Sequence, residues 1–344
     1  MLAGLAFVLA APRLLSLLIA PDRTYPLYGF HYFIHRHIHN LSNSNFYNTL
    51  FGDSSFVVHY LGALGYRFKN GIEQTGTNFG QSQQHDNPLL CEFGRGTMVS
   101  DGLALLNAEY SCASFRLSKV SIGAHNFIGN SVFYPPQGKT AENCLLATKA
   151  MIPIDGPLRS NVGLLGSPCF EIPRSVRRDS RFDEFKEPQL LARRLAAKNV
   201  SNALTILFFV LSYGIVFNLI TLPASLAYVA FGFHGALFIA VLAFPTFVLL
   251  ILHHVFVDWA SRNFQPLQPR YCSIYDPSFW RHERYWKLGL SNDNLVLKLL
   301  NGTPFKSLVW RMLGVRVGRR LFDDGCSMPE KTLVTIGDHC TLGN

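Results

Sequence analysis

Residues 122–165 decide the fold, because in groups of six they read IGAHNF IGNSVF YPPQGK TAENCL LATKAM IPIDGP LRSNVG LL. The first position of each group is large and apolar in every group but one, where Thr140 stands. Four places further on, most residues are small, for example Gly138, Ala150 and Gly156. This is the hexapeptide pattern of an LpxA-like left-handed parallel β-helix, in which three short strands complete each coil and the apolar residue points inward.

The same apolar-then-small start recurs upstream at Phe93 and Val99 and continues in phase at Leu105. We therefore predict that residues 93–168 form about four coils of this kind. The side chains expected inside are those of Ile122, Ile128, Ile152, Leu158 and Leu164. A series of ordinary short strands with chance periodicity is the alternative, and it leaves the small corner residues unexplained.

The amino-acid composition indicates that part of the chain lies in a lipid membrane. Only 15% of the 344 residues are charged and 49% are hydrophobic, whereas about a quarter of a soluble domain is usually charged. This argues against an ordinary cytosolic enzyme and excludes a disordered chain. The net charge of +9 is spread without a block of like charges, which favours an anionic membrane surface over nucleic acid as a partner.

Residues 203–260 contain no Lys, Arg or Glu, and they are too many for one membrane span. We predict two spans, near 201–224 and 234–259, with the break between Pro223 and Gly235. Lys and Arg residues flank this hairpin on both sides, so the positive-inside rule predicts an integral membrane protein with cytoplasmic soluble lobes. Residues 1–20 are also apolar, and they are compatible with a third span, a signal-like anchor or an in-plane helix.

A duplication divides the chain. Ser42-Asn-Ser-Asn and Ser291-Asn-Asp-Asn begin an ungapped match that keeps the same offset through Arg67 and Arg316, and residues 122–130 match 336–344. The chain is therefore expected to hold one unit and the opening of a second, as a fragment of something longer. The predicted parts are a membrane helix at 1–20, interfacial and linking helices at 21–80, a β-helix lobe at 81–175, a basic linker at 176–200, the hairpin at 201–259, interfacial helices at 260–325 and a truncated second lobe at 326–344.

Three longer motifs carry a family resemblance: Phe264-Gln-Pro-Leu-Gln-Pro-Arg-Tyr-Cys-Ser-Ile-Tyr-Asp-Pro-Ser-Phe-Trp-Arg-His-Glu-Arg-Tyr-Trp-Lys287, Asn301-Gly-Thr-Pro-Phe-Lys306 and Gly166-Ser-Pro-Cys-Phe-Glu-Ile-Pro-Arg174. With them the chain resembles the membrane-bound C-terminal region of Pls/PosA-type non-ribosomal peptide synthetases, including ε-poly-lysine synthetase. The resemblance implies tandem lobes that join amino acids into amide bonds. It also implies an adenylation domain and a carrier domain, whose phosphopantetheine is the only cofactor expected. This chain contains neither domain.

Several histidines compete for a role. His31, His35 and His39 are spaced by four, so a helix places them on one face, where a metal site or a polar face at the lipid headgroups would fit. The second interpretation is favoured, and no metal is expected. His253-His-Val-Phe-Val-Asp-Trp259 imitates the HHxxxDG motif of condensation domains, but it has Trp259 in place of Gly and closes an apolar helix.

Acyl transfer to an amine needs a base near the attacking nitrogen. His85, followed by Asp86, lies in a polar loop just before the repeat, and we predict that it is this base with Asp86 orienting it. The competing base is His125, which follows Ile-Gly and is expected at a turn facing water. Asp101 and Asn107 are predicted to line the same cleft as substrate-binding residues, although Asp101 also suits an ordinary turn.

Three functions remain open from the sequence. The first is a membrane-bound acyl- or aminoacyl-transferring lobe that forms amides from carrier-delivered amino acids. The second is a non-catalytic scaffold that docks a carrier protein or the sister lobe at the membrane. The third is a coenzyme A-dependent hexapeptide acetyltransferase, which ranks lower because such soluble enzymes need neither a membrane hairpin nor a duplication.

Overall fold

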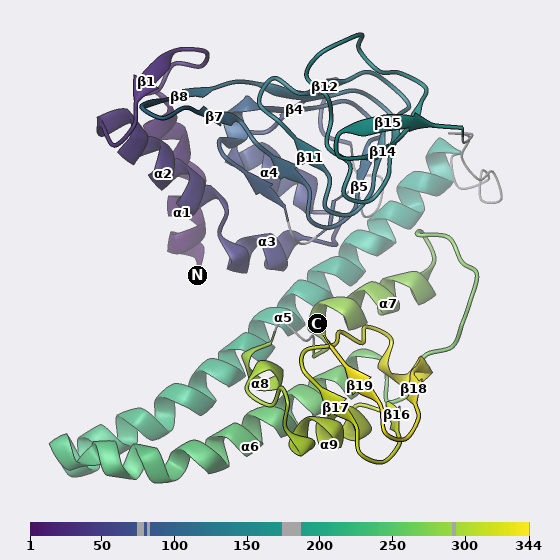
Figure 1. Cartoon of the computed structure of the whole chain (residues 1–344). Coiled ribbons are helices and arrows are strands. Elements are labelled where there is room, and N and C mark those ends of the chain that lie inside the picture. Colours follow the sequence, from purple (N-terminus) through teal and green to yellow (C-terminus); the bar gives the residue numbers. More distant parts are fainter. Residues whose placement is uncertain (74–78, 81–82, 174–186, 291–293, 344) are drawn as a thin grey trace. The chain divides into compact units, whose positions relative to one another are not determined.

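The computed structural model describes residues 1–73, 79–80, 83–173, 187–290 and 294–343 (Figure 1). The chain divides into two compact units, Met1–Asn202 and Ala203–Asn344, which are described separately below. Part of the predicted basic linker, 176–186, and the start of the duplicated match, 291–293, lie outside the described residues.

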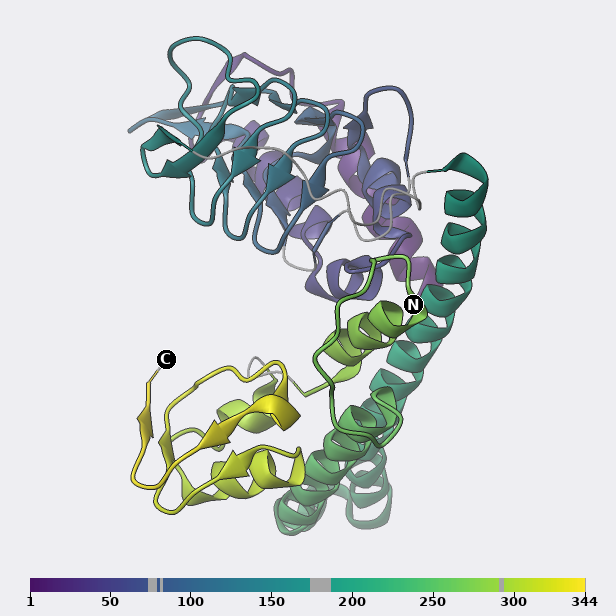
Figure 2. The same cartoon turned by 90° about the vertical axis from the view of Figure 1, so that its right-hand side faces the viewer.

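Short parallel strands in three sheets form the centre of the first unit (Figure 2). Ile122 pairs with Thr140 and Ile128 with Leu146, so each residue meets the one at the same place three hexapeptides further on. From β4 to β13, successive parallel strands along the chain join the three sheets in turn. The first sheet consists of β2 (Arg67–Phe68), β4 (Cys91–Phe93), β9 (Val120–Ile122) and β12 (Lys139–Thr140), and the second of β5 (Met98–Val99), β10 (Phe127–Ile128), β13 (Leu145–Leu146) and β14 (Gly163–Gly166). The third sheet consists of β3 (Gln84–His85), β6 (Ala104–Leu105) and β11 (Phe133–Tyr134).

The six-residue phase predicts most of the interior correctly. Ile122, Ile128, Ile152 and Leu164 are buried as expected. The prediction is wrong for Leu158, whose side chain is 59% exposed. Between the Met151 bridge and β14 the chain forms no strand, because Pro153 and Pro157 lack the N–H that a parallel ladder requires.

The upstream strands join the same sheets at a longer spacing than three hexapeptides. Phe93 pairs with Ile122, and Val99 pairs with Ile128. The extra length holds an antiparallel hairpin of β7 (Ala108–Tyr110) and β8 (Ser114–Leu117), to which β1 (Thr24–Pro26) adds a third strand. At the other end, β15 (Cys169–Ile172) pairs antiparallel with β14.

Helices cover this unit at its N-terminal end. They are α1 (Leu2–Ser16), α2 (Phe30–Ser42), α3 (Asn45–Phe51) and α4 (Val57–Leu64), and a 3-10 turn, η1 (Pro88–Leu90), precedes β4. On α2 the buried side chains are those of Ile34, His35, Ile38 and Ser42, which lie on one face at helical spacing. The prediction that the histidines form a polar face at the lipid headgroups is therefore wrong for His35, because this side chain packs inside the unit.

Two helices are long and apolar enough to cross a membrane, α5 (Pro188–Phe231) and α6 (Gly235–Ser261). Most of their large apolar side chains are exposed, for example Phe217, Leu237 and Phe244. The break is the 3-10 turn η3 (Gly232–His234), at the C-terminal end of the predicted region, and α5 continues through Pro223. The first helix also begins earlier than predicted and includes the described end of the basic linker.

The second unit repeats the element order of the first. It contains α7 (Pro277–Leu288), α8 (Leu295–Lys298), α9 (Pro304–Met312), β16 (Arg316–Val317), β17 (Phe322–Asp323), η4 (Lys331–Leu333), β18 (Thr335–Ile336) and β19 (Thr341–Leu342). Under the offset of the sequence match, α7, α8, α9 and β16 correspond to α2, α3, α4 and β2. Parallel pairs β16–β18 and β17–β19 begin the strand pattern again.

One arginine in each unit supports the duplication in detail. The guanidinium of Arg13, at the end of α1, donates to the carbonyls of Ala63 (2.8 Å) and Gly62 (2.9 Å). The same offset aligns Arg13 with Arg262, which follows α6 and donates to the carbonyl of Leu313 at 3.0 Å. Because Leu313 follows α9 as Leu64 ends α4, the two arginines hold equivalent helix ends.

Candidate functional site

His85 lies in the core of the first unit. Its side chain is 2% exposed, and Nδ1 hydrogen-bonds the Tyr66 hydroxyl at 2.9 Å. Burial lowers the pKa of His85 to about 3, so the imidazole is neutral at physiological pH. The prediction of a base in a surface loop is therefore wrong about its position, since the sequence before the first coil continues the sheet as β3.

Asp86 points away from His85, because successive side chains along an extended strand alternate between its two faces. Its Oδ1 lies 3.4 Å from Nδ1 of His39, and its Oδ2 accepts a hydrogen bond from the Ala108 N–H at 2.9 Å. The predicted orienting carboxylate therefore orients a different histidine, one that is distant in the sequence.

The charge of Asp86 is stabilised where it stands. Burial opposes ionisation, but hydrogen bonds from His39 and from the Ala108 N–H outweigh it and lower the pKa of this carboxyl. The side chains of Asp86 and His39 are 13% and 29% exposed, so the pair reaches the surface. An imidazole held at Nδ1 by an anchored carboxylate is the arrangement that positions a general base.

Asn43 fixes the pair in place. Its side-chain amide donates to the carbonyl of His85 at 2.6 Å and its carbonyl oxygen accepts from the His85 N–H at 3.1 Å. The same amide also donates to the carbonyl of His39 at 2.8 Å, at the end of α2. Asn43 thus occupies the place of a strand partner for β3 and holds the end of α2 beside Asp86.

A second histidine supports the same site from inside. His35 Nε2 hydrogen-bonds the Tyr110 hydroxyl at 2.8 Å, and its ring stacks on Phe115 at 5.3 Å. Burial lowers the pKa of His35 to about 4, although the Asp86 carboxylate opposes this. His35 is thus a neutral, buried neighbour of the His39–Asp86 pair.

The other predicted site residues lie elsewhere. His125 is exposed at a turn with φ of 57°, as expected, and His339 has the same conformation with φ of 58°. Asp101 is an exposed turn residue. Asn107 is fully buried and accepts from the Asn87 N–H at 3.1 Å, so it braces the core and lines no surface cleft.

Two further sequence motifs do not form reactive sites here. The three histidines of α2 diverge, because His31 stacks on Tyr25 at 4.2 Å whereas His35 and His39 have the partners given above. Across the described ranges, no three His, Cys, Asp or Glu side chains gather to hold a metal ion. In the condensation-like motif, His253 bonds Ser212, and Asp258 pairs with Arg262 and Lys331 instead of with a histidine.

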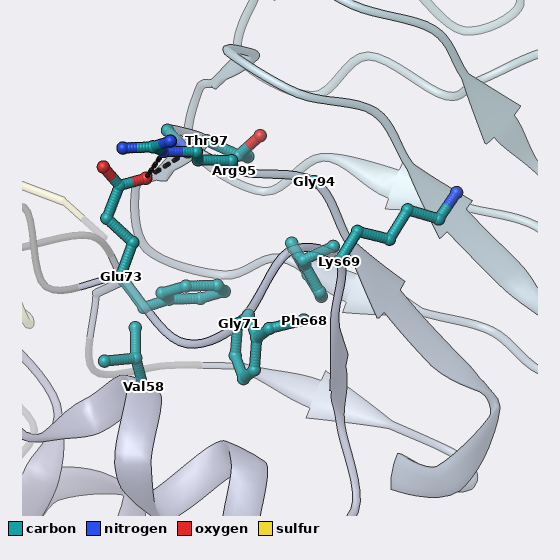
Figure 3. A pocket seen from close by; sticks show the side chains of 11 residues that line it. Val58, Phe68, Lys69, Gly71, Glu73, Gly94, Arg95 and Thr97 are labelled. Carbon is teal, nitrogen blue, oxygen red and sulfur yellow. Dashed lines mark hydrogen bonds and ion pairs between the residues drawn. The ribbon is translucent and has the colours of Figure 1, made fainter.

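A small pocket in the first unit is too tight for a substrate. Figure 3 shows it between the end of β2 and the turn after β4, with the Glu73 carboxylate bonded to Arg95 Nε and to the Gly96 N–H, both at 3.1 Å. Its volume is about 10 Å³, which is room for about one water molecule. The surface beside His39 and Asp86 is the better candidate.

One comparison with known proteins gives a partial match. The chain is 23% identical over 271 residues to a delta-poly-L-ornithine synthetase from Acinetobacter baumannii (strain AB307-0294). The chain is similar to a poly-amino-acid synthetase. The match covers 75% of this chain and 19% of that protein, so the chain spans only a small part of the relative's length.

Two other comparisons add little. No family model matches the chain. Among solved structures, a maltose O-acetyltransferase from Clostridium difficile 630 is 14% identical, with 52% of this chain and 88% of that chain covered and a TM-score of 0.26. A likeness this low assigns no fold, and the strand pairing described above rests on the structure itself.

Both halves of the site are visible in the sequence, but no sequence feature joins them. The four-residue spacing of His35 and His39 and the dipeptide His85-Asp86 are visible in the sequence. The apolar residues Ile34 and Ile38 also indicate that His35 belongs to a buried face. No local signal predicts that α2 crosses beside β3, because that contact arises from tertiary packing alone.

Proposed function

We propose that this chain is a membrane-inserted acyl- or aminoacyl-transfer unit that forms amide bonds, with His39 as the general base and Asp86 as its orienting carboxylate. The observation that carries the proposal is the His39–Asp86 pair at 3.4 Å, in a chain similar to a poly-amino-acid synthetase. The amino acids would arrive as thioesters on the phosphopantetheine of a carrier domain, loaded by an adenylation domain. The phosphopantetheine is attached to the carrier domain, and for this chain it is part of the substrate.

The parallel strands support a left-handed β-helix as the scaffold of this unit. Pairing between residues three hexapeptides apart, rotation among three sheets and buried residues at the first position of every group except that of Leu158 are features of that fold. Such a scaffold is rigid, so it can hold β3 and therefore Asp86 in a fixed position. The second unit would supply a sister lobe of the same construction.

Insertion of α5 and α6 in the membrane supports the same proposal. A helix with apolar side chains exposed along its length leaves a large apolar surface in water, and a bilayer removes that cost. Arg193 and Arg194 precede the apolar segment, and Arg262 and Arg270 follow it, so the first unit and the part of the second unit after α6 would both lie in the cytoplasm. The catalytic pair would then face carriers loaded in the same compartment.

The chemistry at His39 follows from its geometry. The amine nitrogen attacks the thioester carbonyl, the new C–N bond forms and the C–S bond breaks. The imidazole of His39 accepts the proton that the nitrogen loses and then gives it to the departing thiolate, which leaves as a free thiol and restores the neutral imidazole. Asp86 stabilises the imidazolium while it exists, so that proton transfer contributes about 10²–10⁴ to the rate.

A test uses the chain in proteoliposomes with a synthetic ornithyl-pantetheine thioester and free ornithine as acceptor. The expected products are ornithyl-ornithine, joined by one amide bond, and free pantetheine, both formed faster than in liposomes without protein. Thioester consumption at the background rate, in a preparation that still binds a carrier protein, would reject transfer and favour the scaffold function. Equal reaction with acetyl-coenzyme A as the donor would favour the acetyltransferase instead.

A further inference from the structure

The second unit contains a cavity of about 490 Å³ that begins immediately after α6. This volume lies within the range of small-molecule binding sites. Its walls come from the segment 262–272, from α7 between Ser278 and Trp286, and from Glu330 and Leu333 at η4. The offset of the duplication aligns Arg281 and His282 of α7 with Tyr32 and Phe33 of α2. At these two positions the first unit has no charged residue.

The cavity is positively charged. Arg270 and Arg281 line it, are exposed and form no ion pair with any described residue. Glu330 is the one acid among the lining residues that the structure describes, and it is engaged by His282 Nε2 at 3.4 Å and by Trp286 Nε1 at 2.9 Å. Two arginines are thus left to meet a negatively charged ligand, beside the aromatic side chain of Trp286.

The cavity is also held firmly at the end of a helix that can cross a membrane. Asp258, in the last turn of α6, is fully buried and bonds Lys331 Nζ at 2.8 Å and the Leu290 N–H at 3.2 Å. Arg262 stacks over Trp259, with its guanidinium carbon 3.6 Å from the ring centroid. These contacts fix the cavity at the depth where α6 ends, which is the headgroup layer if α6 spans the bilayer.

We propose that this cavity binds the anionic phosphodiester headgroup of a membrane phospholipid, through Arg270 and Arg281. The inference rests on the proposed membrane insertion of α6. Guanidinium groups match phosphate oxygens in planar, two-pronged hydrogen bonds, and a tryptophan suits the interface between headgroups and acyl chains. Such a site would make the second unit select anionic lipid and would orient it against the membrane surface.

The test measures lipid binding to the detergent-solubilised chain by native mass spectrometry, with phosphatidylglycerol as the probe. Phosphatidylcholine is the zwitterionic comparison, because its choline cation offsets the charge of its phosphodiester. The double variant R270A/R281A is expected to bind phosphatidylglycerol about 10²-fold more weakly, because each of the two lost charge-assisted contacts is worth about a factor of 10. The matched control R316A/R319A removes the same charge from exposed positions outside the cavity and should bind as the unsubstituted chain does.

Equal affinities for the two double variants would overturn the proposal. Preferential binding of pantetheine 4′-phosphate at the same arginines, with no response to phosphatidylglycerol, would also overturn it by assigning the site to a carrier arm. Carbonate extraction of the chain from membranes is a separate measurement. Release of the protein by carbonate would reject membrane insertion itself, whereas retention with unchanged lipid binding in R270A/R281A would reject only the lipid site.

Discussion

Leu146 and Leu158 occupy the same position in the six-residue pattern, but the structure separates them. Leu146 is fully buried between Ile128 and Leu164, whereas Leu158 is 59% exposed. Leu146→Ala removes three carbons from the interior, worth about 2.4 kcal/mol at about 0.8 kcal/mol each and up to about 5 kcal/mol if the cavity stays open. Leu158→Ala should cost less than about 1 kcal/mol, because much of that side chain is already in water.

The assay is hydrogen exchange of the intact chain in detergent, followed by mass spectrometry of the peptides that contain β10, β13 and β14. Leu146→Ala should lower the free energy of opening of these strands by the amount given above. All four tryptophans lie in the second unit, so their fluorescence should be unchanged and serves as the internal control. Equal destabilisation by the two substitutions, or none by Leu146→Ala, would refute the assigned interior.

Other predictions concern charge. Burial lowers the pKa of His35 to about 4 and that of His85 to about 3, so the unfolded chain binds more protons. The free energy of unfolding of the first unit should fall by about 1.4 kcal/mol per pH unit for each histidine as the pH falls from about 6.5 towards 4. An unchanged free energy of unfolding down to pH 5, in the same exchange assay, would contradict this. Asp258→Asn leaves two buried cations without their carboxylate and should destabilise the second unit by about 3–5 kcal/mol in denaturant unfolding monitored by tryptophan fluorescence. Glu330→Gln, at a partly exposed pair, should cost less than about 1 kcal/mol, and equal losses would be evidence against the buried network. A cysteine introduced beside Arg194 should react with impermeant reagents only after the cells are opened, and labelling in intact cells would place that flank outside.

The periodic part of the fold could be predicted from the sequence, because the large apolar residue of each six-residue group marks the side chain that points inward. The pattern fails at Leu158, where two prolines interrupt the ladder although the phase continues. Periodicity records side-chain polarity, whereas a strand also needs backbone donors. The two long apolar helices α5 and α6 are equally visible in the sequence, since their apolar length needs no tertiary contact to be recognised.

The candidate site could be predicted only in pieces. Asp86 was assigned to its neighbour in sequence, but strand alternation turns it away from His85 and towards His39. The contact between the end of α2 and β3 depends on Asn43, whose bonds to the His85 backbone no local pattern encodes. Charge and spacing identify reactive residues, whereas the pairing between them is a property of the packed unit.

The role of His39 is tested most directly by the rate of amide formation in His39→Gln, measured beside His37→Gln, which changes an exposed histidine on the same helix. We expect His39→Gln to slow the reaction by about 10²–10⁴ while membrane retention and hydrogen exchange stay unchanged, and His37→Gln to react at the full rate. Amide formation by His39→Gln at the rate of the unsubstituted chain would contradict the assignment of this histidine as the base.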